Sequence, residues 1–141
     1  GKVAERQADS AKRILENNFL CPIKIPIEYV SCESTGSAIV VWAEFDNCIL
    51  GWDALGEKNK YSEKVGEEAA LGLLKQILSK ATLDEYASDQ ILPSLCLAKS
   101  LSIFKVAKVS SHLATNMWLI KKFLDVDFKI SKNKIEIIPN D

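Results

Sequence analysis

The sequence has a single histidine, His112, and none of its four cysteines forms a C-x-x-C pair. Structural zinc sites take four Cys or His ligands, usually with some of them closely spaced, so this shortage argues against one. The phosphate-binding patterns G-x-x-x-x-G-K-[ST] and G-x-G-x-x-G are absent, and so are H-E-x-x-H and G-x-S-x-G. The chain therefore lacks the usual signatures of P-loop enzymes, dinucleotide-binding enzymes, zinc proteases and serine hydrolases.

Long apolar runs are also missing. No run approaches the ~20 residues that a membrane span needs, and no basic segment followed by an apolar one marks a signal peptide. Each cysteine lies in an apolar or strand-like context without secretory signals, which favours buried free thiols in a reducing compartment. We therefore expect a cytoplasmic protein without a membrane partner. The cysteines are Cys21, Cys32, Cys48 and Cys96.

What is present suits a globular fold. The 141 residues are 48% hydrophobic, enough for one compact domain or two small ones. A net charge of −1 argues against nucleic-acid binding, but residues 99–134 hold eight lysines and two carboxylates. Such a local excess can hold a polyanion. It can equally be a solvated lysine-rich surface, and the sequence leaves both open.

Periodicity in the first part of the chain predicts one helix and three strands. The second strand is so apolar that we expect it to be buried on both faces, or nearly so. Pro26 places the first strand at a sheet edge. A polar loop over residues 56–60 is the best candidate for a boundary. The predicted elements are a helix over 2–18, a strand over 23–30 and a hairpin of strands over 38–45 and 48–52.

Beyond that loop the period becomes helical. Asp84 and Ser110 or Ser111 are suited to cap helices, and Pro93 should kink or break the helix that contains it. The order of elements indicates an α+β or open α/β fold, with helices on one face of mixed sheets. The predicted elements are helices over 63–79, 85–99 and from 112, and strands over 101–109, 126–130 and 135–138.

His112 is the first candidate for chemistry. Its predicted place is the first turn of a helix, where the helix dipole disfavours a proton on the imidazole. A neutral imidazole is a nucleophile, and the same helix end offers free N–H groups to a phosphate. The alternative is a lone histidine with a structural role only.

A second candidate is the segment Tyr86-Ala87-Ser88-Asp89-Gln90. On a helix, Tyr86, Asp89 and Gln90 share one side with Pro93. That side offers an aromatic ring, a carboxylate and an amide, which suit a nucleobase or a histidine ring nitrogen. The alternative is a solvated helix face. Thr115 and Asn116, one turn beyond His112, can bond phosphate oxygens or a neighbouring strand, and the structural role is favoured.

Several segments in order resemble a known family. They include Glu63 to Ala70, Asp84 to Gln90, Ser110 to Asn116 and Phe123-Leu124, with Val3 to Arg6 and the region Gly36 to Gly56 before them. This ordered set resembles the C-terminal region of RNA 3'-terminal phosphate cyclases and part of their small inserted domain. No single motif carries the resemblance, which spans nearly the whole chain.

The resemblance implies a chemistry. His112 would attack the α-phosphate of ATP, and its AMP would pass to an RNA 3'-phosphate. The neighbouring 2'-hydroxyl would then close a 2',3'-cyclic phosphate and release AMP, with Mg²⁺ or Mn²⁺ assisting. Tyr86, Ala87, Ser88, Asp89 and Gln90 would lie against the adenylate or the histidine.

The resemblance also implies a fold and partners. Residues 1–53 would belong to the inserted α+β domain and residues 54–141 to the last repeat of a multi-repeat catalytic domain. The partners would be RNA 3'-phosphate ends and the N-terminal half of the enzyme, on the same or a separate chain. The alternative is a non-catalytic RNA-binding or ribosome-biogenesis scaffold of the same fold, although members of that branch lack the histidine.

Overall fold

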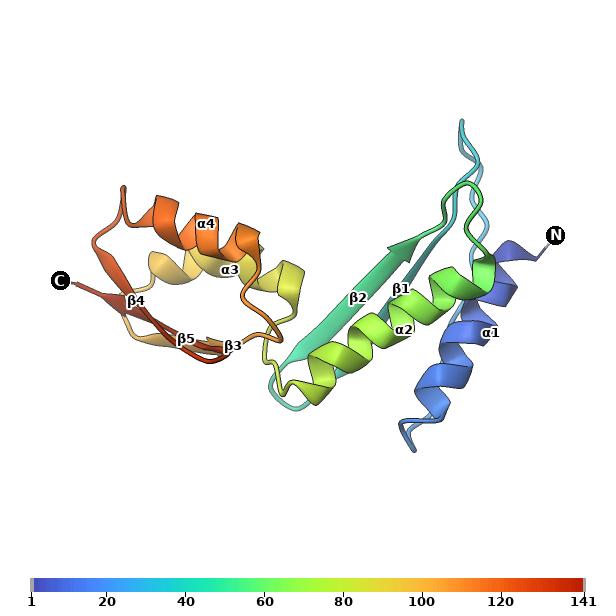
Figure 1. Ribbon diagram of the computed structural model, residues 1–141, viewed down its shortest axis with the longest axis horizontal. Coiled ribbons are helices and arrows are strands. Elements are labelled where there is room, and N and C mark those ends of the chain that lie inside the picture. The colour runs from blue at the N-terminus through green and yellow to red at the C-terminus, as the bar shows by residue number, and fades with distance from the viewer. Residues whose placement is uncertain (1, 141) are drawn as a thin grey trace. The chain divides into compact units, whose positions relative to one another are not determined.

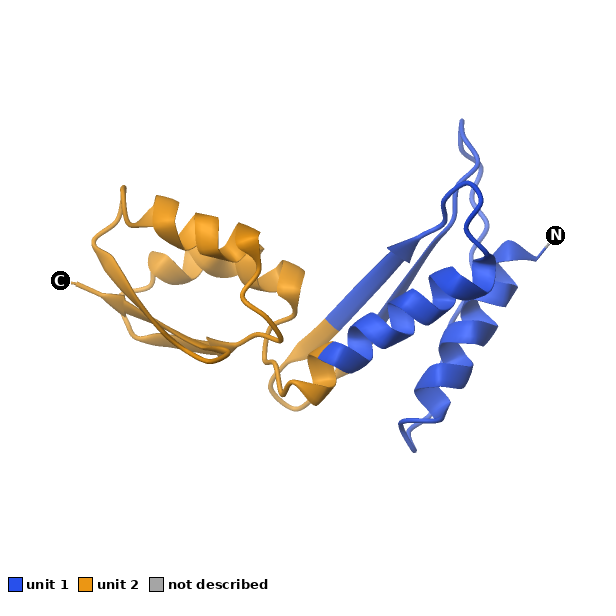
Figure 2. Ribbon diagram, viewed as in Figure 1, with its two compact units in different colours: residues 1–43, 51–75 blue, residues 44–50, 76–141 orange. Residues whose placement is uncertain are grey.

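The computed structural model describes residues 2–140, which form two compact units (Figure 2). The first unit comprises residues 1–43 and 51–75, and the second comprises residues 44–50 and 76–141. The elements are α1 (Val3–Glu16), β1 (Ala38–Glu44), β2 (Ile49–Leu55), α2 (Ser62–Leu78), α3 (Glu85–Cys96), β3 (Ser102–Lys105), α4 (Ser111–Ile120), β4 (Val126–Ser131) and β5 (Lys134–Pro139).

In the first unit, α1 packs against α2, and α2 lies along the β1–β2 hairpin (Figure 1). The guanidinium of Arg6 donates to both carboxylate oxygens of Glu63, at 2.7 and 2.9 Å. Beside it, Ser10 Oγ donates to the Glu63 carbonyl at 2.8 Å. Gly66 permits this close approach, because a methyl group at that position would overlap the backbone of Gln7. The backbones of α1 and α2 thus pack closely at Gly66, and the bidentate ion pair between Arg6 and Glu63 joins the two helices.

Two expectations for this part of the chain are wrong. Residues 23–30 form no strand, and Pro26, which cannot donate to a ladder, sits at the centre of the segment. The β1 strand is buried on one face only. Its side chains alternate, with Ile39 and Val41 at 7% and 5% exposure while Val40 and Trp42 are at 59% and 56%. A two-stranded sheet covered by helices on one side leaves the other side open within the described residues.

In the second unit, α3 and α4 lie on one face of a three-stranded antiparallel sheet with the order β3-β5-β4 (Figure 1). The core lies between them and consists of Leu92, Cys96, Phe104, Val106, Leu113, Met117, Val126, Ile135 and Ile137. The α+β class with helices on one face is thereby confirmed. Both sheets of the described residues are antiparallel, where mixed sheets were expected.

Several boundaries in this unit differ from expectation. The strand predicted over 101–109 is only four residues long, Ser102–Lys105, and beyond it Val106 N–H still donates to the carbonyl of Asn133 in the same register. Helix α3 continues through Pro93 and ends at Cys96. The expected burial of the thiols holds for Cys96 alone, since Cys21 and Cys32 are exposed, although all four cysteines are free.

Candidate active site

His112 is the second residue of α4. The cap is Ser110, one of the two serines that the sequence offered for this role, and its Oγ accepts from Leu113 N–H at 3.0 Å. The N–H groups of the first helical turn have no carbonyl partner inside the helix. Those of Ser111 and His112 therefore lie at the positive end of the helix, and the His112 side chain is exposed beside them. An imidazole and a site suited to phosphate oxygens thus share one helix end.

A side-chain hydrogen bond connects α4 to α3. Asn116 Nδ2 donates to the main-chain carbonyl of Asp89, with 3.4 Å between the atoms. In a regular helix, that carbonyl would accept from the N–H four residues later, which is position 93. Pro93 has no N–H, so the carbonyl is left for another donor. Pro93 therefore does not break α3. It leaves the Asp89 carbonyl without a main-chain donor, and the Asn116 side chain donates to that carbonyl instead.

This contact places His112 relative to Tyr86. Helices α3 and α4 run in the same direction, because β3 carries the chain back between them (Figure 1). His112 lies one turn before Asn116 on the same side of α4, and Tyr86 lies one turn before Asp89 on the same side of α3. Since Asn116 meets Asp89 and the helices run in the same direction, position 112 at the start of α4 lies next to the end of α3 that carries Tyr86. The Tyr86 side chain is half exposed, at 50%.

The remaining predicted residues of α3 divide into two groups. Gln90 is exposed, and Asp89 and Ala87 are half-buried. Ser88 is fully buried, and its Oγ donates to the carbonyl of Glu85 at 2.9 Å. Its side chain therefore offers no accessible atom to a ligand. The accessible polar groups of this face come from Tyr86, Asp89 and Gln90.

The start of α3 is fixed by Asp84. Its carboxylate accepts from the N–H groups of Tyr86 and Ala87, at 3.1 and 2.7 Å. The sequence predicted this cap. It did not predict the contact between Asn116 and Asp89, because that contact depends on how two helices pack and not on either helix alone.

Metal ligands are not gathered at this face. Within residues 2–140, no group of three or more His, Cys, Asp and Glu side chains is placed to hold a metal ion. We therefore assign no step to metal ligands of this chain. Over the same residues, no helix is both long enough and apolar enough to cross a membrane.

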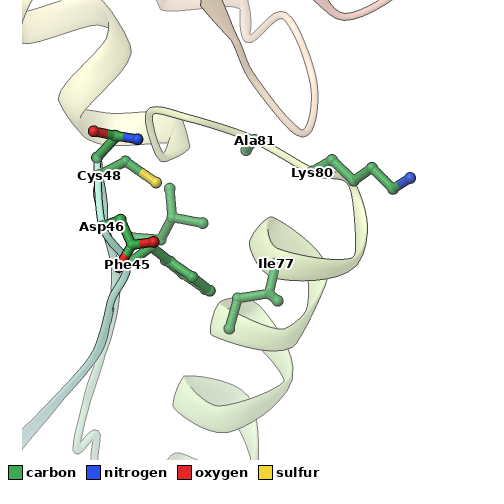
Figure 3. Close-up of a pocket in the computed structure, with 8 residues that line it drawn as sticks. Phe45, Asp46, Cys48, Ile77, Lys80 and Ala81 are labelled. Atoms are coloured by element: carbon green, nitrogen blue, oxygen red, sulfur yellow. The ribbon is translucent and has the colours of Figure 1, made fainter.

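A separate pocket lies at the turn of the β1–β2 hairpin (Figure 3). The Phe45 ring points toward Ile77 at the end of α2, while the Lys80 ammonium points away from the pocket. The lining residues are Phe45, Asp46, Asn47, Cys48, Leu50, Ile77, Lys80 and Ala81. None of the residues predicted from the sequence to carry chemistry lines this pocket, so it is distinct from the face around His112.

Residues 1–78 match the insert domain of the RNA 3'-terminal phosphate cyclase (RTC) family. This match extends beyond position 53, where the sequence predicted the end of the inserted domain. That predicted boundary between residues 53 and 54 stays a prediction.

Whole proteins in curated collections extend the similarity over most of the chain. The RNA 3'-terminal phosphate cyclase of Thermococcus onnurineus is 43% identical over 128 residues, which cover 91% of this chain and 37% of the relative. That of Methanopyrus kandleri is 45% identical over 134 residues, covering 91% and 38%. That of Archaeoglobus fulgidus is 37% identical over 137 residues, covering 97% and 40%. The chain thus spans less than half the length of these relatives, and it belongs to the RNA 3'-terminal phosphate cyclase family.

Proposed function

We propose that this chain supplies the nucleotide-accepting histidine of an ATP-dependent RNA 3'-phosphate cyclase. In the first step, a ring nitrogen of His112 attacks the α-phosphorus of ATP. A nitrogen–phosphorus bond forms, the bond to the β-phosphate oxygen breaks, and pyrophosphate leaves. AMP then passes to a terminal RNA 3'-phosphate, and the adjacent 2'-hydroxyl displaces AMP to give the 2',3'-cyclic phosphate.

The observation that carries this proposal is the position of His112 at the start of α4. A nucleophile needs its target phosphate close by and held in a fixed orientation. The first-turn N–H groups and the positive helix end meet both needs for an anionic α-phosphate. The exposed ring of Tyr86 offers an apolar surface for the adenine. Asp89 and Gln90 lie on the same side of α3 as this ring.

The remainder of the site would come from protein outside these residues. The relatives are more than twice as long as the matched region, since it covers 37% to 40% of their length. We propose that the N-terminal part found in those relatives, on the same or a separate chain, completes the site. Mg²⁺ or Mn²⁺ would assist there. RNA 3'-phosphate ends are the proposed substrates.

Intact-mass spectrometry tests the first step directly. The chain is incubated with ATP and Mn²⁺, alone and together with a polypeptide that corresponds to the N-terminal part of a longer relative. We expect a mass increase of one AMP that is absent from the His112→Ala variant. Ser111→Ala is the matched control, because it changes the neighbouring first-turn residue without removing a nucleophilic ring.

Two outcomes would contradict the proposal. An AMP adduct that persists in His112→Ala would place the nucleophile elsewhere. No adduct in either mixture would favour the alternative function, a non-catalytic RNA-binding scaffold of the same fold.

A further inference from the structure

The sheet of the second unit has one buried face and one open face. Phe104, Ile135 and Ile137 point toward α3 and α4 and are at most 4% exposed. Because side chains alternate along a strand, their neighbours point to the opposite face. Both helices of the second unit lie on the same side (Figure 1), so no helix described within that unit covers the opposite face.

Lysines dominate this open face near the β4–β5 turn. Lys105 of β3 lies directly opposite Lys134 of β5, and Lys129 of β4 lies opposite Glu136 of β5. Lys132 sits in the turn with a left-handed backbone, at φ 56°. Together Lys105, Lys129, Lys132 and Lys134 form what we call the sheet lysine cluster.

The pairing of Lys105 with Lys134 is unfavourable in the isolated chain. Residues directly opposite each other on antiparallel strands bring their Cβ atoms within about 5.5 Å, and like charges in that position are destabilising. One of the two charges is balanced, since Lys134 Nζ lies 2.6 Å from Glu136 Oε1. Within residues 2–140, the ammonium groups of Lys105, Lys129 and Lys132 have no ion-pair partner.

The other carboxylate of this face is also occupied. Asp127 of β4 accepts from Lys121 Nζ at 2.6 Å and from Asn140 Nδ2 at 3.3 Å. Positive charge therefore predominates at the turn end of the face, in the same segment that carries eight lysines and two carboxylates over residues 99–134. A ligand with regularly spaced negative charges would relieve the repulsion between Lys105 and Lys134.

We propose that the sheet lysine cluster binds the phosphate backbone of an RNA strand. The choice of RNA as the polyanion rests on the proposed function, whereas the surface itself rests on the strand register and the charges. The exposed apolar side chains of this face are Ile103 and Ile138, at 51% and 37%. The strands present no aromatic ring on it for base stacking, so the contact is to phosphates and carries no sequence preference.

The salt dependence of RNA binding tests this surface. A fluorescent single-stranded RNA is titrated with the 141-residue chain at several salt concentrations, and the variant combines Lys105→Gln, Lys129→Gln and Lys132→Gln. Each phosphate contact on a single strand contributes about 0.7 to the slope of log affinity against log salt. Loss of three contacts should reduce that slope by about 2. Lys134 is retained because it pairs with Glu136.

A matched variant separates location from net charge. Lys12→Gln, Lys24→Gln and Lys58→Gln remove the same charge from the first unit, and we expect the slope to stay unchanged. Equal losses in both variants, or an unchanged slope in the sheet variant, would overturn the proposal. It would also be overturned if the cluster bound vesicles of anionic lipid while the chain failed to bind RNA.

Two further measurements, the urea midpoint and the AMP adduct, separate lost RNA binding from lost folding and from lost catalysis. Lys105→Gln should not lower the urea midpoint of unfolding, because it removes a repulsive pair, so lost RNA binding would not reflect lost structure. The sheet variant should keep the AMP adduct on His112. RNA binding that depends on the lysines without any AMP adduct would leave the surface supported and contradict the proposed catalysis. An AMP adduct without lysine-dependent RNA binding would support the proposed catalysis and overturn the proposed RNA surface.

Discussion

Asn116 on α4 donates its side-chain amide to the main-chain carbonyl of Asp89 on α3, at 3.4 Å. The helix cannot supply a donor for this carbonyl, because the residue four positions later is Pro93. The N–H that Pro93 lacks thus leaves a carbonyl on α3 to which α4 can bond. The two helices that carry the candidate site are held in register by this hydrogen bond and by the core beneath them.

This relationship predicts an energetic coupling between Pro93 and Asn116. Asn116→Ala leaves the Asp89 carbonyl without its donor and should lower the free energy of unfolding by about 0.5–1.5 kcal/mol. In a Pro93→Ala background the main chain supplies an N–H to that carbonyl, so the same change should cost less. Urea denaturation of the two single variants and the double variant measures the difference. Strictly additive effects would show that the two residues act independently.

Tyr86 provides a prediction about nucleotide contact, which rests on the proposed function. Tyr86→Ala removes an exposed ring from the side of α3 that faces the His112 end of α4, and it should slow formation of the AMP adduct by about tenfold, equivalent to ~1.4 kcal/mol. Tyr86→Phe keeps the ring and should retain most of the rate, because the proposed contact is with the ring face. The measurement is the time course of the adduct by intact mass. Equal loss in both variants would assign the contact to the hydroxyl instead.

Local chemistry explains what the sequence predicted correctly. Asp84 was identified as a cap, and Ser110 as one of two candidates, because an N-cap depends only on a short side chain and the N–H groups two or three residues later. The helical position of His112 follows from the second cap. The α+β class followed in the same way, from the change between alternating and helical periods.

Non-local pairing explains what the sequence did not predict. Residues 23–30 alternate like a strand, but a strand also needs a partner with free donors and acceptors, and among the described residues none pairs with this segment. The apolar run over 38–45 could not reveal that Val40 and Trp42 face outward, since burial depends on which elements cover the sheet. The contact between Asn116 and Asp89 was missed for the same reason.

Glu63 predicts a pH dependence of stability in the first unit. Its hydrogen bonds with Arg6, and a further one to the backbone, lower the pKa of Glu63 to about 2 from an ordinary value of 4.5. A carboxylate with a lowered pKa in the folded state stabilises the fold above its unfolded pKa, and this contribution disappears as the pH falls toward the folded value. Glu63→Gln should therefore flatten the dependence of the urea midpoint on pH between about 4.5 and 2.

The control for this change is Glu33→Gln, which removes an exposed carboxylate from the irregular segment before β1. It should leave the wild-type pH profile in place. Arg6→Gln should reproduce the effect of Glu63→Gln, because it removes the other partner of the same ion pair. Parallel profiles for the wild type and Glu63→Gln would mean that the pair does not influence folding.

Replacing Gly66 with alanine should lower the free energy of unfolding, although alanine has the higher helix propensity. Replacing an internal helix glycine with alanine normally stabilises a helix by about 1 kcal/mol. At position 66, however, the new methyl group would overlap the carbonyl of Gln7 on α1 and lie close to the N–H of Ala11. Backbone atoms cannot rotate away, so α1 must move off α2.

We therefore expect Gly66→Ala to lower the free energy of unfolding by about 1–3 kcal/mol, the usual cost of overpacking. Gly36→Ala is the control, since a methyl group at position 36 meets nothing within 4 Å. Urea denaturation measures both changes, and amide hydrogen exchange in α1 reports where the loss occurs. A Gly66→Ala variant as stable as the wild type would show that α1 can shift without loss, and the bidentate contact between Arg6 and Glu63 should then be broken.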